Sequence, residues 1–146
     1  SWDQRHTFNA SLGYNAEGYG FTITSYYNSG TAYSFEPMSE SSLAGLNLLP
    51  NNSYKPSNIA VDLRAHYLVK ISDSISGRFV LSIYNLFDRL NEMSVYSDTG
   101  RAYYSIITDT ERAAYRSTFS SLEDVFSDPG MYSAPRQIRL SLELKF

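Results

Sequence analysis

Apolar and polar residues alternate along most of this chain, and the alternation is clearest over its last nine residues, 138–146. A period of two places successive side chains on opposite faces of a β-strand, whereas the period of 3.6 that marks an amphipathic helix is nearly absent. The same alternation predicts further strands over residues 6–14, 19–28, 58–71 and 77–85. The sequence therefore predicts an all-β protein.

Short and long connections alternate between the predicted strands. Residues 15–18 and 72–74 read as short turns, whereas residues 29–57 and 109–134 are long polar stretches that we interpret as loops. Two shorter strands are predicted at 93–97 and 101–108, with a helical turn near 42–46 and a short helix over 110–119. The result is an antiparallel meander of about seven strands, with the long loops at one end and the short turns at the other.

One face of the predicted sheet is charged. Asp62, Arg64, His66 and Lys70 follow one another at a spacing of two, so all share a strand face. Charged groups in a dry core are costly, so we expect these four residues to line a wet lumen. The opposite face, which carries residues such as Val61, Leu63 and Tyr67, would then contact lipid.

The alternation alone would also fit a soluble antiparallel sheet with one wet face. Three features favour a transmembrane sheet instead. The strands run to about 9–12 residues, longer than the soluble mean of about 5–6. The chain holds 13 Tyr and 8 Phe, many of them near strand ends, as in the aromatic girdles of outer-membrane barrels. The asymmetry of loop lengths is also typical of those barrels.

A sheet in lipid must pair all its backbone groups, so it must close into a barrel. Bacterial single-chain barrels have even strand numbers, from 8 upward. A set of about seven strands is therefore expected to be incomplete. The remaining strands would come from residues that precede Ser1 or from another chain, and the opening residues lack the features of a signal peptide.

Composition argues against several other classes of function. The 146 residues carry a net charge of −3, without the basic patch that nucleic-acid binding requires. The absence of cysteine excludes disulfides and thiolate metal sites, and no apolar run is long enough for a spanning helix. The two histidines, His6 and His66, give no metal-ligand spacing. Glu123, Asp124 and Asp128 do not form an ordered calcium loop, so no metal and no cofactor is predicted.

Several stretches resemble the TonB-dependent outer-membrane receptors. Asn85-Leu86-Phe87-Asp88 resembles the "NLFD" element of that family, and the segment 95–101 resembles the stretch that usually follows it. Further similarities lie in Asp3-Gln4-Arg5-His6, Ser29-Gly30, Val61-Asp62-Leu63-Arg64 and Pro135-Arg136, the last of which precedes an alternating strand that ends in Phe146. The resemblance covers the whole chain.

The resemblance implies a 22-stranded barrel in the outer membrane of a Gram-negative bacterium, filled by an N-terminal plug. Such receptors import scarce nutrients with energy from the inner membrane, delivered by the TonB complex. This chain, residues 1–146, would supply the C-terminal strands, while the upstream strands, the plug and the TonB contact lie outside this sequence. Phe146 would be the assembly signal that the barrel-assembly machinery reads.

The candidate ligand contacts lie in the two long loops, because loops over a barrel mouth are where specificity resides. They are the aromatic and basic residues Tyr33, Phe35, Arg112, Tyr115 and Arg116, together with Phe119. The alternative is that these side chains pack loop against loop. The Asn85–Asp88 element is expected to be structural, with its polar ends capping a strand while Leu86 and Phe87 pack.

The sequence thus favours a porin-like importer of a siderophore, cobalamin, glycan or peptide. The alternative is a structural barrel segment or subunit without transport of its own. A third possibility is a soluble β-sandwich binding module. No Gly-x-Ser-x-Gly element is present, and Asp62, Arg64 and His66 fit a solvated wall better than a proton-transfer site, so the chain is not expected to be an enzyme.

Overall fold

The computed structural model describes residues 3–36, 49–106 and 128–146. The helical turn expected near 42–46 and the helix expected over 110–119 lie outside these residues. The chain divides into two compact units, which are considered separately. The sheet unit comprises Thr7–Tyr27, Ile59–Leu90 and Ala134–Phe146, and the loop unit comprises Ser1–His6, Asn28–Asn58 and Asn91–Ser133.

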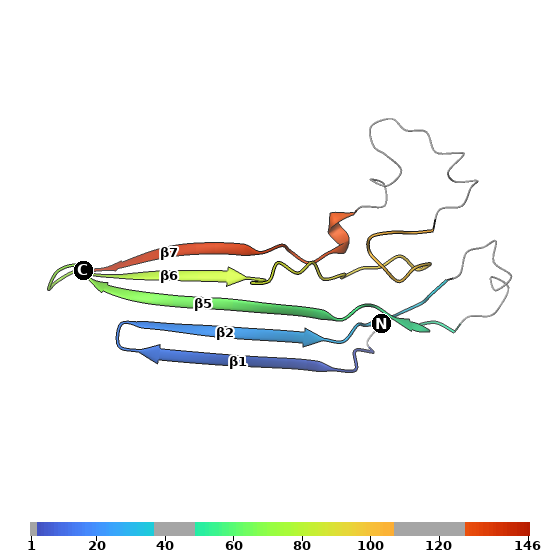
Figure 1. The fold of residues 1–146 in the computed structure, drawn as a ribbon, viewed down its shortest axis with the longest axis horizontal. Coiled ribbons are helices and arrows are strands. Elements are labelled where there is room, and N and C mark those ends of the chain that lie inside the picture. The colour runs from blue at the N-terminus through green and yellow to red at the C-terminus, as the bar shows by residue number, and fades with distance from the viewer. Residues whose placement is uncertain (1–2, 37–48, 107–127) are drawn as a thin grey trace, which may run out of the picture. The chain divides into compact units, whose positions relative to one another are not determined.

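The sheet unit is built on one antiparallel sheet of five strands, in the order β1-β2-β5-β6-β7 (Figure 1). The strands are β1 (Thr7–Ala16), β2 (Tyr19–Asn28), β5 (Asn58–Lys70), β6 (Ser76–Tyr84) and β7 (Gln137–Lys145). These are the five strands that the alternation predicts most clearly, so the all-β, antiparallel part of the prediction is confirmed.

The strand register aligns the apolar residues of neighbouring strands. Phe79 in β6 lies opposite both Tyr67 in β5 and Leu142 in β7. Ile83 lies likewise opposite Leu63 and Ile138. Directly opposed residues share a face, so the apolar side chains of three strands form one continuous surface. We call it the apolar face, and the other side of the sheet the polar face.

The hairpin of β1 and β2 continues both faces. The ring of Tyr14 contacts the rings of Tyr19 and Phe21, with centroids 6.0 and 5.9 Å apart. Gly20 lies on the opposite face, where a Cβ atom would come within 2.7 Å of His66 Cε1 and 2.8 Å of the Tyr14 carbonyl oxygen. A glycine is therefore needed beside His66.

Short turns close one end of the sheet. Gly18, with φ of 91°, completes the turn between β1 and β2, and Ile71 N–H donates to the Ile75 carbonyl oxygen at 3.0 Å between β5 and β6. The chain ends at this same end of the sheet, and the two long connections leave from the opposite end (Figure 1). The predicted separation of short turns and long loops is confirmed by this topology.

The loop unit contains a short ribbon that the sequence did not indicate. Strand β3 (Ala32–Tyr33) pairs antiparallel with β4 (Ser53–Tyr54), inside the stretch 29–57 that was predicted to be a long loop with a helical turn near 42–46. A single turn of 3₁₀-helix, η1 (Pro129–Met131), follows Asp128, whose Oδ1 accepts a hydrogen bond from Gly130 N–H at 2.8 Å. The five long strands and this ribbon are therefore not the seven-strand meander that was expected.

The strand predicted at 93–97 is not formed. The strand predicted at 101–108 is not formed over 101–106, the part of it that the structure describes. Side chains there accept the backbone hydrogen bonds that a strand partner would otherwise accept. Ala102 N–H donates to Glu92 Oε2 at 2.6 Å, and Ile106 N–H donates to Asp98 Oδ2 at 2.6 Å. Such local acceptors compete with sheet pairing, which accounts for the wrong prediction.

The sheet unit is a single layer and lacks a conventional core. Across the described residues, the buried apolar side chains are only Ala32, Val80 and Ala102. None of the helices in the described part of the chain could span a membrane. Soluble domains normally bury one face of a sheet against a second layer, so the exposed faces are the features that require explanation.

Candidate functional site

The apolar face is the most extensive feature of the sheet unit. Large apolar side chains are exposed on all five strands of the sheet, and Leu140, near the middle of β7, is 73% exposed. They include Phe8, Leu12, Phe21, Tyr67, Phe79, Ile138, Leu142 and Leu144. A contiguous apolar patch across five strands marks a surface that lies against lipid or another protein.

The polar face carries all four residues predicted to line a lumen. Arg64 lies opposite Ser82, His66 opposite Val80 and Lys70 opposite Ser76, while Asp62 precedes Arg64 at the same spacing of two. Their side chains do not converge on a common point. Lys70 Nζ forms an exposed ion pair with Asp73 Oδ1 at 2.9 Å, and His66 packs beside Gly20. The geometry gives a charged wall rather than a catalytic triad.

Asp62 has a structural role at the end of β6. Its Oδ1 accepts a hydrogen bond from Asn85 N–H at 2.9 Å. The buried side chain of Asn85 then donates from Nδ2 to the carbonyl oxygens of Arg89 and Ala134 at 3.0 and 3.1 Å, while its Oδ1 accepts from Arg89 N–H at 3.0 Å. Asn85 also adopts a left-handed φ of 53°, which asparagine tolerates better than most residues.

Asp88 completes this connection. Its φ is 54°, and its Oδ1 accepts a hydrogen bond from Arg136 N–H at 2.8 Å, just before β7 begins. The predicted capping role of the polar ends of the Asn85–Asp88 element is therefore confirmed. Leu86 is half-buried, but Phe87 is 73% exposed, so the predicted packing of Phe87 is wrong: it belongs to the exposed apolar surface of the unit.

The ligand contacts predicted in the loops fall into two groups. Tyr33 and Phe35 lie in the loop unit, whereas Arg112, Tyr115, Arg116 and Phe119 lie outside the described residues. The Tyr33 hydroxyl occupies the space beside Gly100 where a Cβ atom would be, so Tyr33 packs against a turn. Phe35 is held through its backbone, whose N–H donates to Asn52 Oδ1 at 2.7 Å and whose carbonyl accepts from Asn52 Nδ2 at 3.2 Å.

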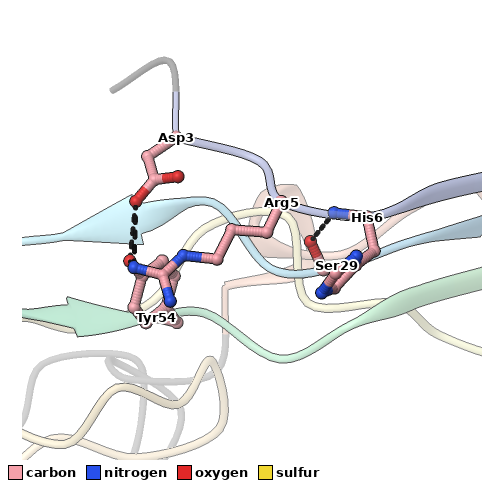
Figure 2. A network of polar contacts seen from close by, with 5 residues as sticks. All are labelled: Asp3, Arg5, His6, Ser29 and Tyr54. Carbon is pink, nitrogen blue, oxygen red and sulfur yellow. Dashed lines mark hydrogen bonds and ion pairs between the residues drawn. The ribbon is translucent and has the colours of Figure 1, made fainter.

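One polar network of the loop unit was not predicted. Tyr54 Oη in β4 donates to Asp3 Oδ2 at 2.6 Å, and Arg5 donates to the same hydroxyl oxygen while its guanidinium lies 4.6 Å from the centre of the Tyr54 ring (Figure 2). Next to it, His6 N–H donates to Ser29 Oγ at 3.0 Å. No local pattern links Asp3 to a tyrosine 51 positions later, so only the fold reveals this cluster.

The network shifts two pKa values in opposite directions. The Tyr54 hydrogen bond is the main cause that holds the pKa of the Asp3 carboxyl below its usual 3.8. The same bond raises the pKa of the Tyr54 hydroxyl above its usual 10.0. The contact therefore stabilises the fold at pH values between the lowered pKa of Asp3 and the raised pKa of Tyr54. Its contribution is lost as pH falls through the first and as pH rises through the second.

Replacing Tyr54 with phenylalanine is expected to return the pKa of Asp3 upward toward 3.8, because the hydroxyl that donates to Asp3 Oδ2 is removed. The titration of the Asp3 side-chain carboxyl carbon, followed by NMR, measures this directly. An unaltered Asp3 titration in the Tyr54→Phe variant would contradict the network.

A second polar cluster of the loop unit is partly buried. The Glu92 side chain is 10% exposed, pairs with Arg101 Nη2 at 2.8 Å and accepts from Ala102 N–H. Burial, and next the nearby Glu92 carboxylate, raise the pKa of Tyr132. Both carboxylate oxygens of Glu92 thus have partners within the fold, and the described residues contain no cluster of side chains suited to a metal ion. In the described part of the loop unit, these polar side chains therefore form structural networks.

Comparison with protein-family models, with curated protein sequences and with solved structures gives no match to this chain. The class of fold is therefore defined by the structure alone, as an antiparallel all-β sheet of five strands with one apolar and one polar face, both open.

Proposed function

We propose that this chain forms part of the wall of a transmembrane β-barrel in the outer membrane of a Gram-negative bacterium. The observation that carries the proposal is the apolar face, on which large side chains of β5, β6 and β7 lie in register and yet are exposed. A single sheet of this kind has no protein layer to bury these side chains within its unit. Lipid acyl chains would bury them without any second layer.

The energetics favour such an environment. Full burial of one Leu, Ile or Phe side chain contributes about 1.5–3 kcal/mol. More than ten large apolar side chains on the sheet strands are exposed. If water covered the apolar face, the protein would lose a large part of the hydrophobic free energy that drives folding. The strands β1 and β7 form the outer edges of the sheet, and in lipid their backbone groups require partner strands. We propose that further barrel strands supply these partners.

We further propose that the barrel belongs to an importer of the TonB-dependent type, which takes up a siderophore, cobalamin, glycan or peptide. The ordered sequence motifs support this, and so does the charged polar face, which suits a wet interior occupied by a plug. The TonB complex and the barrel-assembly machinery would be its partners. The alternative is a wall segment without transport of its own, which is supported by the way Tyr33 and Phe35 are held within the loop unit.

Fractionation of cells that express the intact protein tests the membrane assignment. We expect the protein in the outer-membrane fraction, soluble only with detergent and with a gel mobility that changes on heating. Recovery in the soluble fraction without detergent would contradict the proposal and favour a β-sandwich binding module. Uptake of a labelled nutrient that requires both this protein and the inner-membrane potential would separate an importer from a purely structural wall.

A further inference from the structure

We infer that the polar face holds a binding site for the oxyanion group of a small solute, a phosphate or a carboxylate, between Arg64 of β5 and Arg139 of β7. The site deepens the proposed function, and its role as a contact along a solute path rests on that function. The inference itself rests on three features of the sheet unit: a row of opposed residues, a hollow beside it and an excess of positive charge.

The row is fixed by the strand register. Ser82 in β6 lies directly opposite Arg64 on one side and Arg139 on the other. Neighbouring strands are about 4.8 Å apart, so the two arginine Cα atoms are separated by about 10 Å across the Ser82 hydroxyl. Arginine side chains are long enough to converge from both sides over such a span. Each guanidinium is a planar group of paired donors of the kind that binds oxyanions best, and the Ser82 hydroxyl lies on the same face.

A hollow of about 330 Å³ adjoins this row. It is lined by Arg64 and by the hydroxyl groups of Thr22, Thr24, Ser82 and Tyr84. Its volume lies in the range of small-molecule pockets, and hydroxyl groups can donate to an oxyanion or accept from a hydroxyl of the solute. The hollow therefore offers hydrogen-bonding groups to a small polar solute, beside the apolar surface of Leu63 and Tyr26.

Arg139 is oriented toward this region by an aromatic ring. Its guanidinium carbon lies 5.3 Å from the centre of the Tyr84 ring, and Tyr84 lines the hollow. Stacking on a ring fixes the guanidinium plane and leaves N–H groups at its edge available. One of these N–H groups donates to Gln137 Oε1 at 3.3 Å, and the others can reach a ligand.

The charge on the polar face is positive although the chain as a whole carries −3. On β5, β6 and β7 the cations of this face outnumber the carboxylates: they are Arg64, Lys70, Arg78, Arg139 and Lys145 against Asp62 and Glu143. Both carboxylates already have a partner: Glu143 forms an ion pair with Arg78 at 3.8 Å, and Asp62 accepts a hydrogen bond from Asn85 N–H. Among the residues that the structure describes, neither Arg64 nor Arg139 has a carboxylate within ion-pair distance. A soluble anion would supply the missing partner.

Asp62 also lines the hollow, and its negative charge opposes an anion there. Removing this charge should therefore raise the affinity for an anion. Asp62→Asn keeps an oxygen that can accept from Asn85 N–H but removes the charge, so anion binding should become several-fold tighter. Arg64→Gln and Arg139→Gln should each weaken binding by about tenfold or more, because each removes a charge-assisted donor pair.

The experiment is a calorimetric titration of the intact protein in detergent micelles, with inorganic phosphate and with succinate as probes. Arg78→Gln is the matched control, since Arg78 is a cation on the same face that is already paired with Glu143. We expect binding that is weakened about tenfold or more in each of the two arginine variants, retained in Arg78→Gln and strengthened several-fold in Asp62→Asn. Binding of phosphate alone would identify a phosphorylated solute as the source of the oxyanion, and binding of succinate alone a carboxylic acid. The heat-dependent gel mobility of each variant controls for folding.

Equal binding by wild type and by the Arg64→Gln/Arg139→Gln double variant would overturn the inference. An equal loss in Arg78→Gln would also overturn it, because it would indicate a general positive potential. If the protein bound an acidic peptide but neither phosphate nor succinate, the ligand would be a polypeptide, and the inferred site for a small solute would be wrong. The titration depends on neither localisation nor uptake. A protein that fractionates with the outer membrane but lacks arginine-dependent binding would therefore refute this site alone.

Discussion

Leu140→Arg is expected to lower the free energy of unfolding in a lipid bilayer by about 2–4 kcal/mol, the cost of an arginine near the bilayer midplane on the lipid side of a barrel strand. Leu140 lies near the middle of β7, opposite Leu81 in β6, which itself lies opposite Ala65 in β5. The charge would therefore enter the centre of the apolar face. Equilibrium unfolding by urea of the protein refolded into vesicles gives the change in free energy.

The next residue along the chain provides a matched control. Ser141 lies on the polar face opposite Val80, so Ser141→Arg should change the unfolding free energy by less than about 1 kcal/mol. Both variants introduce the same side chain at nearly the same depth, and they differ only in the face that receives it. Similar losses in the two variants, or a greater loss for Ser141→Arg, would contradict the assignment of the faces.

Asn85→Ala is expected to cost about 3–4 kcal/mol of stability. The substitution removes three side-chain hydrogen bonds, each worth about 1 kcal/mol, and places alanine at a left-handed φ of 53°, which costs about 1 kcal/mol more. Because Asn85 connects the end of β6 to Ala134 before β7, the loss should be seen as an earlier global unfolding transition in the same urea measurement.

Asn85→Gly separates the two contributions. Glycine also lacks the hydrogen bonds but adopts a positive φ without strain, so it should be about 1 kcal/mol more stable than the alanine variant. A glycine variant as stable as wild type would mean that the hydrogen bonds of Asn85 contribute nothing, and it would remove the structural role assigned to the Asn85–Asp88 element.

The sequence predicted the five long strands and their two faces because the period of two is a local signal. Each strand carries it independently, from Phe8, Ala10 and Leu12 in β1 to Leu140 and Leu142 in β7. The predicted shared face of Asp62, Arg64, His66 and Lys70 followed from the same spacing. Local alternation does not determine which residues of neighbouring strands lie opposite each other. This register is known only from the structure.

The features missed in the sequence all depend on long-range pairing or on competing side chains. The β3–β4 ribbon pairs Ala32 with Tyr54 across a long insertion, with only two residues in each strand. The segment 93–106 contains strand-forming residues, but Glu92 and Asp98 accept its backbone hydrogen bonds. The row of Arg64, Ser82 and Arg139 exists only because three strands adopt one register, so neither arginine could be assigned to a common site from its position in the chain.

Single-cysteine spin labelling along β7 tests most directly whether the apolar face lies against lipid, and residues 1–146 contain no cysteine that would compete for the label. Labels at residues 138–145 of the intact protein in bilayers would be compared for access to oxygen, which enriches in lipid, and to a water-soluble nickel complex. We expect alternation, with oxygen access at positions 138, 140, 142 and 144 and nickel access at positions 139, 141, 143 and 145. Nickel access at all of these positions, or the absence of alternation, would contradict it.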